Sequence, residues 1–532
     1  MNVFSTLRQK IREVFRRMLP YKSIEQAEKI ETPISNDMTN ALDAWHSMYL
    51  EKADWLDDDG VFSLNLPAQI ACEEARQILL EMKWSITAPL EEGEAGPEDG
   101  SDPMNPRAQF LSDEFEKLMP VLRQKLELGL AAGGMIIKPY PNAETKRVHF
   151  DVTPDWSFYP LSFDDDGQLT EVIIPDIYVE GKTFYTRLER HKLVGDRVQI
   201  SQKAFKSNNK NVIGTEIPLT DVEHWAGLMP ESMVANTEGS LFGWFKVASA
   251  NTIDPDCPLG LSCFAKAAGL IKQADLQYSR LLWEYKASEM AIDVDPTALR
   301  PRKDGKGQEL PSLDQRLFRQ VDLDKGDRDL YEVFAPNIRD ANYINGLNQT
   351  LMRIEDLCGI SRGTLSDANT EARTATELRI VRQRTYATIS ENQDALERCL
   401  RDVIRAMDKY ADAYKLAPAG AYEVSFEWDD SVLTDANEEL QKRMLLFSNG
   451  MVSKAEMREW YFGETPAQAK AAIEAVVEED RGAQAAATEE LLPKLERDLI
   501  DKSSNEFPED GDDEKAKTKK DKDEEDEDDE EE

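Results

Sequence analysis

The chain has 532 residues and a formal net charge of −39, enough length for several domains but the wrong charge for a protein that grips DNA phosphates. Hydrophobic residues make up 41% of it, which allows a real core, and no apolar run reaches the roughly 18 residues of a membrane helix. Five cysteines without a C-x-x-C pair and four isolated histidines indicate neither a disulfide framework nor a zinc site, and fit a reduced, cytosolic setting.

Negative charge is spread along the chain and concentrated at its end. Residues 509–532 hold sixteen acidic residues and five lysines, a net charge of −11, which leaves −28 for the rest. This tail is too charged and too poor in apolar residues to fold, so we expect it to be disordered. For the body two interpretations stay open: an acidic wall past which a duplex could slide, or the ordinary solubility of an acidic protein.

A basic amphipathic helix is predicted over residues 3–19, and Pro20 ends it. This segment lacks the apolar core of a signal peptide. The pattern fits a membrane-surface helix, a helix docked on a partner, or a packed terminal helix. The apolar face consists of Phe4, Leu7, Ile11, Val14, Phe15 and Met18.

The next segments predict helices and then strands. Residues 38–90 are expected to be mostly helical, 91–106 to be a loop, and 108–131 to be another helix that ends at Gly133. The apolar period then changes to two, and short turn sequences separate five strands, which predicts an antiparallel meander. The strands are MIIKPY, RVHFDVT, TEVIIPDIYV, TFYTRLERH and RVQISQKAF.

A helix is predicted over about 262–290, followed by short strands and loops over 292–337, where prolines interrupt the chain. The second segment carries a local basic cluster in an otherwise acidic chain. It is either a solvated loop or a surface that binds a partner. The cluster consists of Arg300, Arg302, Lys303 and Lys306.

The stretch 341–463 is the most informative region of the chain. The helix ANYINGLNQTLMRIEDLC leads into the polar loop GISRGTLSDANTEARTATEL and then into a very long helix that reaches about Tyr414. Thr374 and Glu377 fit a capping box, and about forty residues at about 1.5 Å each give a rod of about 60 Å. Spacing alone leaves a coiled coil or the spine of a helical bundle open. The apolar stripe is Leu378, Val381, Ile389, Leu396, Leu400, Val403, Met407, Tyr410 and Tyr414, with Thr385 and Asn392 in its gaps.

No pattern in the chain predicts catalysis or metal binding. Two Asp-Asp-Asp-Gly runs, 57–60 and 164–167, lack the alternating oxygen ligands of a calcium loop and are better interpreted as turns. The chain has no G-x-x-x-x-G-K-[ST] loop, nucleophile elbow or H-E-x-x-H motif. We therefore expect a protein that is not an enzyme, with no cofactor, no metal and no catalytic residue.

Several motifs follow one another in an order that is specific as a set. CPLGLSCFAKAAGLIKQADLQYSRLLWEYKAS is followed by the loop with ARTATEL, the long helix, the strand YEVSFEW, DDSVLTDANEE and NGMVSKAEMRE. Over roughly residues 35–475 this set resembles the portal proteins of tailed, siphovirus-like bacteriophages. The first motif is similar to their first stem helix after a P-L-G-x-S turn. Residues 450–456 are similar to the G-x-x-S-x-x-E step before their crown helices.

The resemblance implies an α+β, mainly helical subunit of the portal type. It would have long wing and stem helices, an antiparallel β meander in the wing, a small α/β clip and a helical crown. The expected regions are a basic N-terminal arm (1–34), a first wing segment (35–258), stem helix 1 (259–291), the clip (292–337), stem helix 2 (338–359), the tunnel loop (360–374), a second wing segment with the long helix (375–434), the crown (435–500) and a disordered acidic tail (501–532).

The resemblance also implies a function. Such a protein forms a ring, usually a dodecamer, at one capsid vertex, through which double-stranded DNA is packaged, retained and ejected. The implied partners are further copies of the chain, double-stranded DNA without sequence preference, the terminase large subunit, a head-completion or adaptor protein, and the major capsid and scaffolding proteins. No membrane is implied, and the location is the virion, preceded by the host cytoplasm during assembly.

Two sets of site residues follow from the resemblance. In the tunnel loop, small polar residues would leave the backbone mobile beside a channel, and the two arginines could touch phosphates. A plain connector between helices is the other interpretation of this loop. The clip would bind a partner through Arg300, Arg302, Lys303 and Lys306. The tunnel-loop residues are Arg362, Gly363, Thr364, Ser366, Asn369, Thr370 and Arg373.

Two functions from other classes remain as alternatives. The first is a cytosolic helical scaffold or adaptor that binds only proteins. The second is an acid-dependent hydrolase. A closed ring with an axial channel would separate the portal interpretation from both.

Overall fold

The protein folds as two compact units, Met1–Leu433 and Thr434–Glu532, and combines helices with mostly antiparallel sheets, as expected for the α+β class. The computed structural model describes residues 21–57, 60–80, 82–89, 103–142, 145–209, 211–294, 300–301, 308–309, 318–320, 331–367, 375–428, 436–462, 469–473 and 476. Within these residues, no helix is long and apolar enough to cross a membrane.

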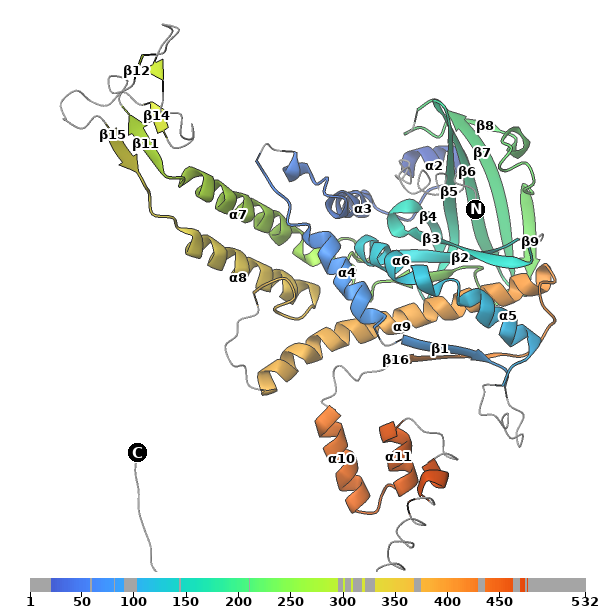
Figure 1. Cartoon of the computed structure of the whole chain (residues 1–532). Helices are drawn as coiled ribbons and strands as arrows, with labels where there is room; N and C mark the ends of the chain where they lie inside the picture. The colour runs from blue at the N-terminus through green and yellow to red at the C-terminus, as the bar shows by residue number, and fades with distance from the viewer. Residues whose placement is uncertain are drawn as a thin grey trace, which may run out of the picture. The chain divides into compact units, whose positions relative to one another are not determined.

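In the first unit, α7 (Ala268–Ala287) and α8 (Asp340–Cys358) extend away from the strands of the largest sheet (Figure 1). Short 3-10 turns, η1 (Asp54–Leu56), η2 (Asp155–Ser157), η3 (Leu219–Asp221) and η4 (Ala265–Ala267), lie between helices and strands of this unit along the chain. The α-helices are α2 (Tyr21–Glu28), α3 (Asn36–Tyr49), α4 (Leu66–Ile78), α5 (Pro106–Phe115), α6 (Met119–Ala132), α7 (Ala268–Ala287), α8 (Asp340–Cys358) and α9 (Ala375–Ala413).

The largest sheet is an antiparallel meander with strand order β4-β5-β6-β7-β8, and β9 also pairs with β7. Two smaller sheets of the same unit are β10-β2-β3 and the pair β1-β16. The strands are β1 (Met82–Thr87), β2 (Gly134–Asn142), β3 (Arg147–Pro154), β4 (Tyr159–Phe163), β5 (Leu169–Glu180), β6 (Thr183–Val194), β7 (Arg197–Ser207), β8 (Thr215–Ile217), β9 (Glu231–Ala235), β10 (Gly243–Lys246) and β16 (Glu423–Trp428).

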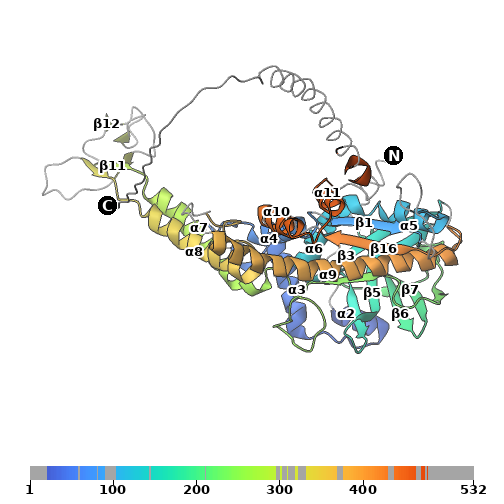
Figure 2. The same cartoon turned by 90° about the horizontal axis from the view of Figure 1, so that it is seen from below.

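The predicted long helix is confirmed as α9, which runs beside β1 and β16 (Figures 1 and 2). Its apolar stripe is buried at Leu396, Leu400, Val403 and Met407, all fully shielded from solvent. Polar Asn392 interrupts the stripe but is buried too, because its side-chain oxygen accepts a hydrogen bond from the main chain of residue 248 at 3.0 Å. The other end of the stripe, Leu378 and Val381, and the proposed cap Thr374 lie outside the described residues and side chains.

A glycine lets the small sheet lie directly on α9. Gly243 of β10 faces the helix, and a Cβ there would lie 2.1 Å from the main-chain oxygen of Cys399. No side chain fits that gap. The contact joins α9 to one hydrophobic core that also contains parts of α3 to α6, β2, β3, the start of α7 and the end of α8.

The predicted meander is corrected in its first two strands. The last three predicted strands become β5, β6 and β7 of the meander, but the first two, β2 and β3, belong to the separate sheet with β10. The chain leaves β3 through the turn η2, whose residues Asp155, Trp156 and Ser157 are all buried. This buried turn separates the two sheets. The alternation of apolar residues does not predict where one sheet ends and the next begins.

Two further expectations need correction. Residues 82–87, predicted within a mostly helical stretch, form β1, whose partner β16 begins more than 300 residues later. The single helix expected over 108–131 is two helices, α5 and α6. Pro120 stands in the first turn of α6, where a missing N–H is tolerated, whereas a continuous helix would lose a hydrogen bond there.

The segment between α7 and α8 contains short strands, as expected for residues 292–337. A three-stranded sheet has the order β14-β11-β15, and β12 pairs with β13. The strands are β11 (Ala291–Val294), β12 (Arg300–Pro301), β13 (Gln308–Glu309), β14 (Phe318–Gln320) and β15 (Tyr331–Phe334).

The second unit contains the helices α10 (Ala436–Ser448) and α11 (Lys454–Phe462). A capping box starts α11: the Ser453 N–H donates to Glu456 Oε2 at 2.8 Å, and the Glu456 N–H donates to Ser453 Oγ at 3.2 Å. These are the Ser and Glu of the predicted G-x-x-S-x-x-E step. Its physical role is therefore to begin a helix.

Candidate functional site

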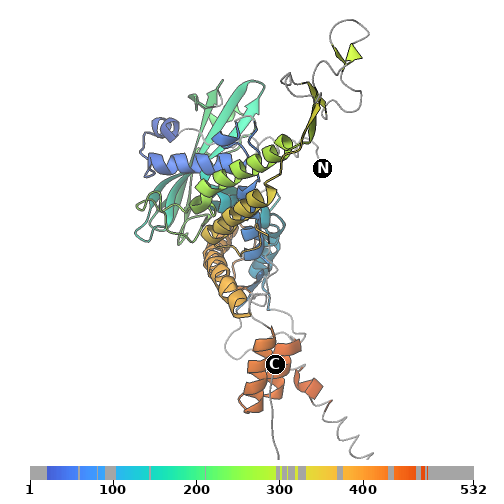
Figure 3. The same ribbon diagram turned by 90° about the vertical axis from the view of Figure 1, so that its left-hand side faces the viewer.

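The candidate site begins with the pair of helices α7 and α8, which lie side by side (Figure 3). Near the end of α7, Glu284 accepts two hydrogen bonds from Arg339, at 3.1 Å from Nε and 3.0 Å from Nη2. Further along the pair, Thr350 Oγ1 donates to Gln277 Oε1 at 3.2 Å. These contacts hold α7 and α8 together, and none of them reaches the loop that follows α8.

A glycine ends α8 and turns the chain toward α9. Gly359 has φ +76°, a left-handed conformation that favours glycine. A Cβ at this position would also lie 2.7 Å from Thr388 Oγ1 of α9. The next residue, Ile360, is buried in the core, so the first residue of the loop is anchored there.

Glu355 in the last turn of α8 binds the loop that follows this helix. Its side chain is fully buried, and its two oxygens accept four hydrogen bonds from the loop. Oε1 accepts the backbone N–H groups of Gly363, Leu365 and Ser366 at 3.1, 2.6 and 2.9 Å. Oε2 accepts the Ser366 hydroxyl at 2.7 Å. One carboxylate thus binds the whole turn 363–366.

A second carboxylate, that of Asp356, pairs with Arg362 of the loop. Arg362 donates from Nε and Nη2 to its two oxygens at 2.9 and 2.7 Å, and these hydrogen bonds raise the pKa of Arg362. Arg353 Nη1 lies 3.7 Å from the same carboxylate. Two partly exposed guanidinium groups therefore share the Asp356 carboxylate.

The loop is also tied to both neighbouring helices by neutral side chains. Asn348 of α8 accepts the Asp367 N–H through Oδ1 at 2.8 Å. Ser361 Oγ and Thr385 Oγ1 of α9 lie 3.0 Å apart in a hydrogen bond. Thr385, predicted to fill a gap in the apolar stripe, is buried by this contact.

The family of phage portal proteins of the SPP1 Gp6-like type matches residues 110–485. The chain belongs to this family. The predicted resemblance is therefore confirmed, and the matched range contains α7, α8, the loop and α9 of this portal protein. The family is one of structural proteins. A comparison with curated proteins found no match.

Only some of the predicted tunnel-loop residues of the portal protein are exposed. Arg362, Gly363 and Thr364 face solvent in the single chain. Ser366 was expected to leave the backbone mobile, but it is 7% exposed and its hydroxyl is bound to Glu355, so we correct its role to that of an anchor. The remaining predicted residues, Asn369, Thr370 and Arg373, lie outside the described region of the chain.

The basic cluster of the portal protein falls in the segment between α7 and α8. Arg300 lies on β12, opposite Glu309 of β13 in the strand register. Arg302, Lys303 and Lys306 lie outside the described residues. Partner binding by this cluster stays a prediction.

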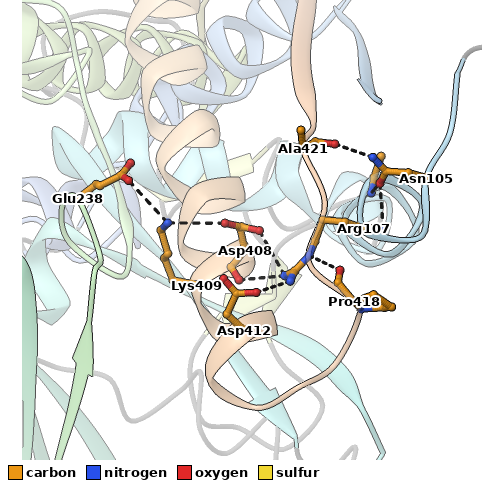
Figure 4. Close-up of polar contacts among 9 residues, drawn as sticks. Asn105, Arg107, Glu238, Asp408, Lys409, Asp412, Pro418 and Ala421 are labelled. Carbon is orange, nitrogen blue, oxygen red and sulfur yellow. Dashed lines mark hydrogen bonds and ion pairs between the residues drawn. The ribbon is translucent and has the colours of Figure 1, made fainter. Parts of the chain in front are cut away.

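The far end of α9 is fastened by a buried arginine (Figure 4). Arg107 of α5 is 1% exposed, and it donates to the main-chain oxygens of Pro418 at 2.9 Å and Asp408 at 3.1 Å. Its Nη2 also pairs with the Asp412 carboxylate. Asn105 caps α5 and donates to a carbonyl of the connection after α9. The cation thus joins the last turns of α9 to the connection that follows, and it lies near a helix C-terminus, where positive charge is favourable.

The side chains of α8 that hold the loop were not predicted from the sequence. Glu355 and Asp356 stand in the last turn of a predicted helix, where negative charge is unfavourable, and glycines follow at 359 and 363. Acidic residues at the end of a helix, followed by glycines, were the signal that could have predicted a carboxylate bound to the backbone of the next loop. Asn348 gave no signal, because its partner stands nineteen residues away.

Proposed function

We propose that the chain assembles into a closed ring, a dodecamer, at one vertex of a phage capsid. Double-stranded DNA passes through this ring when it is packaged, is retained behind it, and leaves through it on ejection. The family match over residues 110–485 carries the proposal, because that range includes α7, α8, the loop and α9 together. The protein takes its place in the virion after assembly in the host cytoplasm.

Exposed apolar side chains support association of several subunits. Trp283 and Tyr285 on α7 are 64% and 40% exposed, and Met290 after the helix is 56% exposed. Residues two apart on a helix face different sides, so Trp283 and Tyr285 leave apolar surface on more than one side of α7. In a closed ring one face of each subunit meets a different face of the next, which would cover such groups around the whole ring.

The loop 360–374 faces the channel in this proposal. Because Arg362 is paired with Asp356, the described part of the loop, residues 360–367, presents little free positive charge to a passing duplex. Strong binding to phosphates would require several unpaired cations per subunit, and a chain with a net charge of −39 does not supply them. Weak contact suits a wall along which DNA slides.

The remaining partners follow from the same role. The terminase large subunit docks on the ring during packaging, and a head-completion or adaptor protein replaces it afterwards. The segment 292–337 with its basic cluster is the surface we assign to them. The major capsid and scaffolding proteins surround the ring at the vertex.

A packaging assay with a charged loop tests this function. Thr364→Lys is chosen because Thr364 is exposed, and it is combined with Asn369→Lys. We expect rings of normal mass whose DNA translocation is severalfold slower than that of the wild type, most strongly at low salt, because added cations hold phosphates.

The matched control carries Thr364→Gln and Asn369→Gln, which add length without charge. It should translocate DNA at close to the wild-type rate. Wild-type rates for the lysine variant at every salt concentration would contradict a DNA path along this loop.

A further inference from the structure

Glu355 is a carboxylate in an unfavourable place. It stands in the last turn of α8, where the helix dipole presents partial negative charge, and it is fully buried. A buried carboxylate beside the negative end of a helix dipole is costly unless other groups bind it. A helix of this kind would be more stable with a neutral or basic residue, so an opposing interaction must account for Glu355.

The loop supplies that interaction. Three backbone N–H groups and one hydroxyl point at the two carboxylate oxygens, at 2.6 to 3.1 Å. Successive N–H groups of a turn form a concave site for an anion, and hydrogen bonds to a charged acceptor are stronger than neutral ones. The turn in return needs an acceptor, because the N–H groups of half-buried Leu365 and buried Ser366 have no place in a helix or sheet. The N–H of exposed Gly363 also lies within hydrogen-bond distance of Ser366 Oγ, at 3.1 Å.

The other ties of this turn come mainly from the same helix. Arg362 binds Asp356, and the Asp367 N–H binds Asn348. Residues 362–367 are therefore held at both ends and in the middle by side chains of α8. Toward α9, the described residues add a hydrogen bond between Ser361 and Thr385, which lies just before this turn.

We propose that Glu355 is the positioning residue of this loop: it fastens the turn 363–366 to the end of α8, so that the loop moves with this helix as one body. The effect on DNA rests on the function proposed above, whereas the fastening itself does not. A shift of α8 is then passed directly to the surface beside the DNA. Without the anchor the loop would move independently of the helix.

Hydrogen exchange of the assembled full-length protein tests the fastening. In Glu355→Gln the side chain keeps its size but loses its charge and places an N–H₂ group near the loop donors. We expect amide exchange in a peptide covering 361–367 to become about tenfold faster, because charge-assisted hydrogen bonds are lost. Unchanged exchange in this peptide would overturn the proposal.

Two further variants make the result interpretable. Ser366→Ala removes only the hydroxyl bond to Oε2, so it should accelerate exchange less than Glu355→Gln, and it remains informative if the first variant does not fold. Glu284→Gln removes another buried helix carboxylate, one that binds Arg339 and not the loop. It should leave exchange of the 361–367 peptide unchanged. Equal acceleration by Glu284→Gln would show a general loosening and overturn the specific role of Glu355.

DNA translocation by the same rings tests the consequence for function. If wild-type rings package DNA, Glu355→Gln rings should pause more often and move DNA severalfold more slowly, while Glu284→Gln rings should not. Wild-type translocation by Glu355→Gln rings with a loosened loop would overturn the coupling between α8 and DNA. If even wild-type rings move no DNA, the proposed function fails, whereas the exchange experiment still decides whether Glu355 fastens the loop.

Discussion

At the scale of single residues, Glu74 is a buried carboxyl group with a raised pKa. Glu74 of α4 is 3% exposed, and its Oε2 has no hydrogen-bond partner among the described residues. Burial raises the pKa of Glu74 to about 7, and this effect outweighs a hydrogen bond with Cys263 that lowers the pKa. Because the pKa in the folded state exceeds the ordinary value of 4.5, protonation of Glu74 favours folding.

The sign of the pH dependence follows from this shift. The stabilising contribution of Glu74 is complete below about pH 4.5 and is lost as the pH rises through about 7, a change of about 3 kcal/mol in the free energy of unfolding. Glu74→Gln is neutral at every pH. The melting temperature of this variant, relative to the wild type, should therefore be higher at pH 8 than at pH 5.

Thermal unfolding at the two pH values measures this difference. Glu116→Gln removes an exposed carboxylate between α5 and α6 and serves as the control, with no expected change between pH 5 and pH 8. If Glu74→Gln differs from the wild type by the same amount at both pH values, Glu74 does not titrate between them.

At the scale of elements, Arg107 joins α5, the end of α9 and the connection that follows. Arg107→Ala removes the nearer of two cations beside Asp408, which is 15% exposed at its side chain, and leaves Lys409 at 3.8 Å. Removing one partner of a buried pair is strongly destabilising, so we expect a loss of about 3 kcal/mol and a lower melting temperature. Arg76→Ala on α4 removes an arginine that is 62% exposed and should change stability by less than about 0.5 kcal/mol. Equal melting temperatures for the two variants would contradict a structural role for Arg107.

Asp356 provides a prediction for the loop element. Asp356→Asn frees Arg362 from its bidentate partner and adds one positive charge per subunit. We expect rings with higher DNA affinity and slower translocation, both most pronounced at low salt. Asp367→Asn adds the same charge at an exposed site without releasing Arg362, so it should have the smaller effect. Identical salt dependence in the two variants would mean that Arg362 does not reach the DNA.

Prediction from the sequence succeeded for elements whose signal is local. The apolar period of three and four residues predicted α9 to within a residue or two of its C-terminal end, because Leu396 to Met407 must all face one core. Prediction from the sequence failed for β1, because its partner strand begins at Glu423 and no residue pattern near Met82 indicates that pairing. In the site, the loop was located from its glycines and polar residues, but its anchors were not. A hydrogen bond between Asn348 and Asp367 depends on how the chain folds back, which spacing does not reveal.

At the scale of the whole molecule, the proposed ring requires surfaces that only other chains complete. The first unit leaves Trp283 and Tyr285 exposed on α7, and the second unit, taken by itself, leaves Leu445, Met451 and Phe462 between 61% and 74% exposed. Burial of such side chains would stabilise an assembly by about 25 cal/mol per Å² of apolar surface. The amount exposed on each unit is consistent with a protein that functions as an oligomer.

The basic cluster gives a prediction for docking at this scale. Replacing Arg300, Arg302, Lys303 and Lys306 by glutamine should leave the ring intact and weaken its binding to the terminase or to the head-completion protein, because charge pairs at an interface speed association and favour the right partner. The control carries glutamine at Lys266 and Lys272, which lie at or near the start of α7. Unchanged packaging and unchanged head completion in the cluster variant would show a solvated loop without a partner.

Electron microscopy of the purified full-length chain tests the central claim most directly. We predict closed rings with an axial channel and, in averaged images, the loop after α8 on the channel wall. A strictly monomeric particle at micromolar concentrations, with its helices folded, would contradict it.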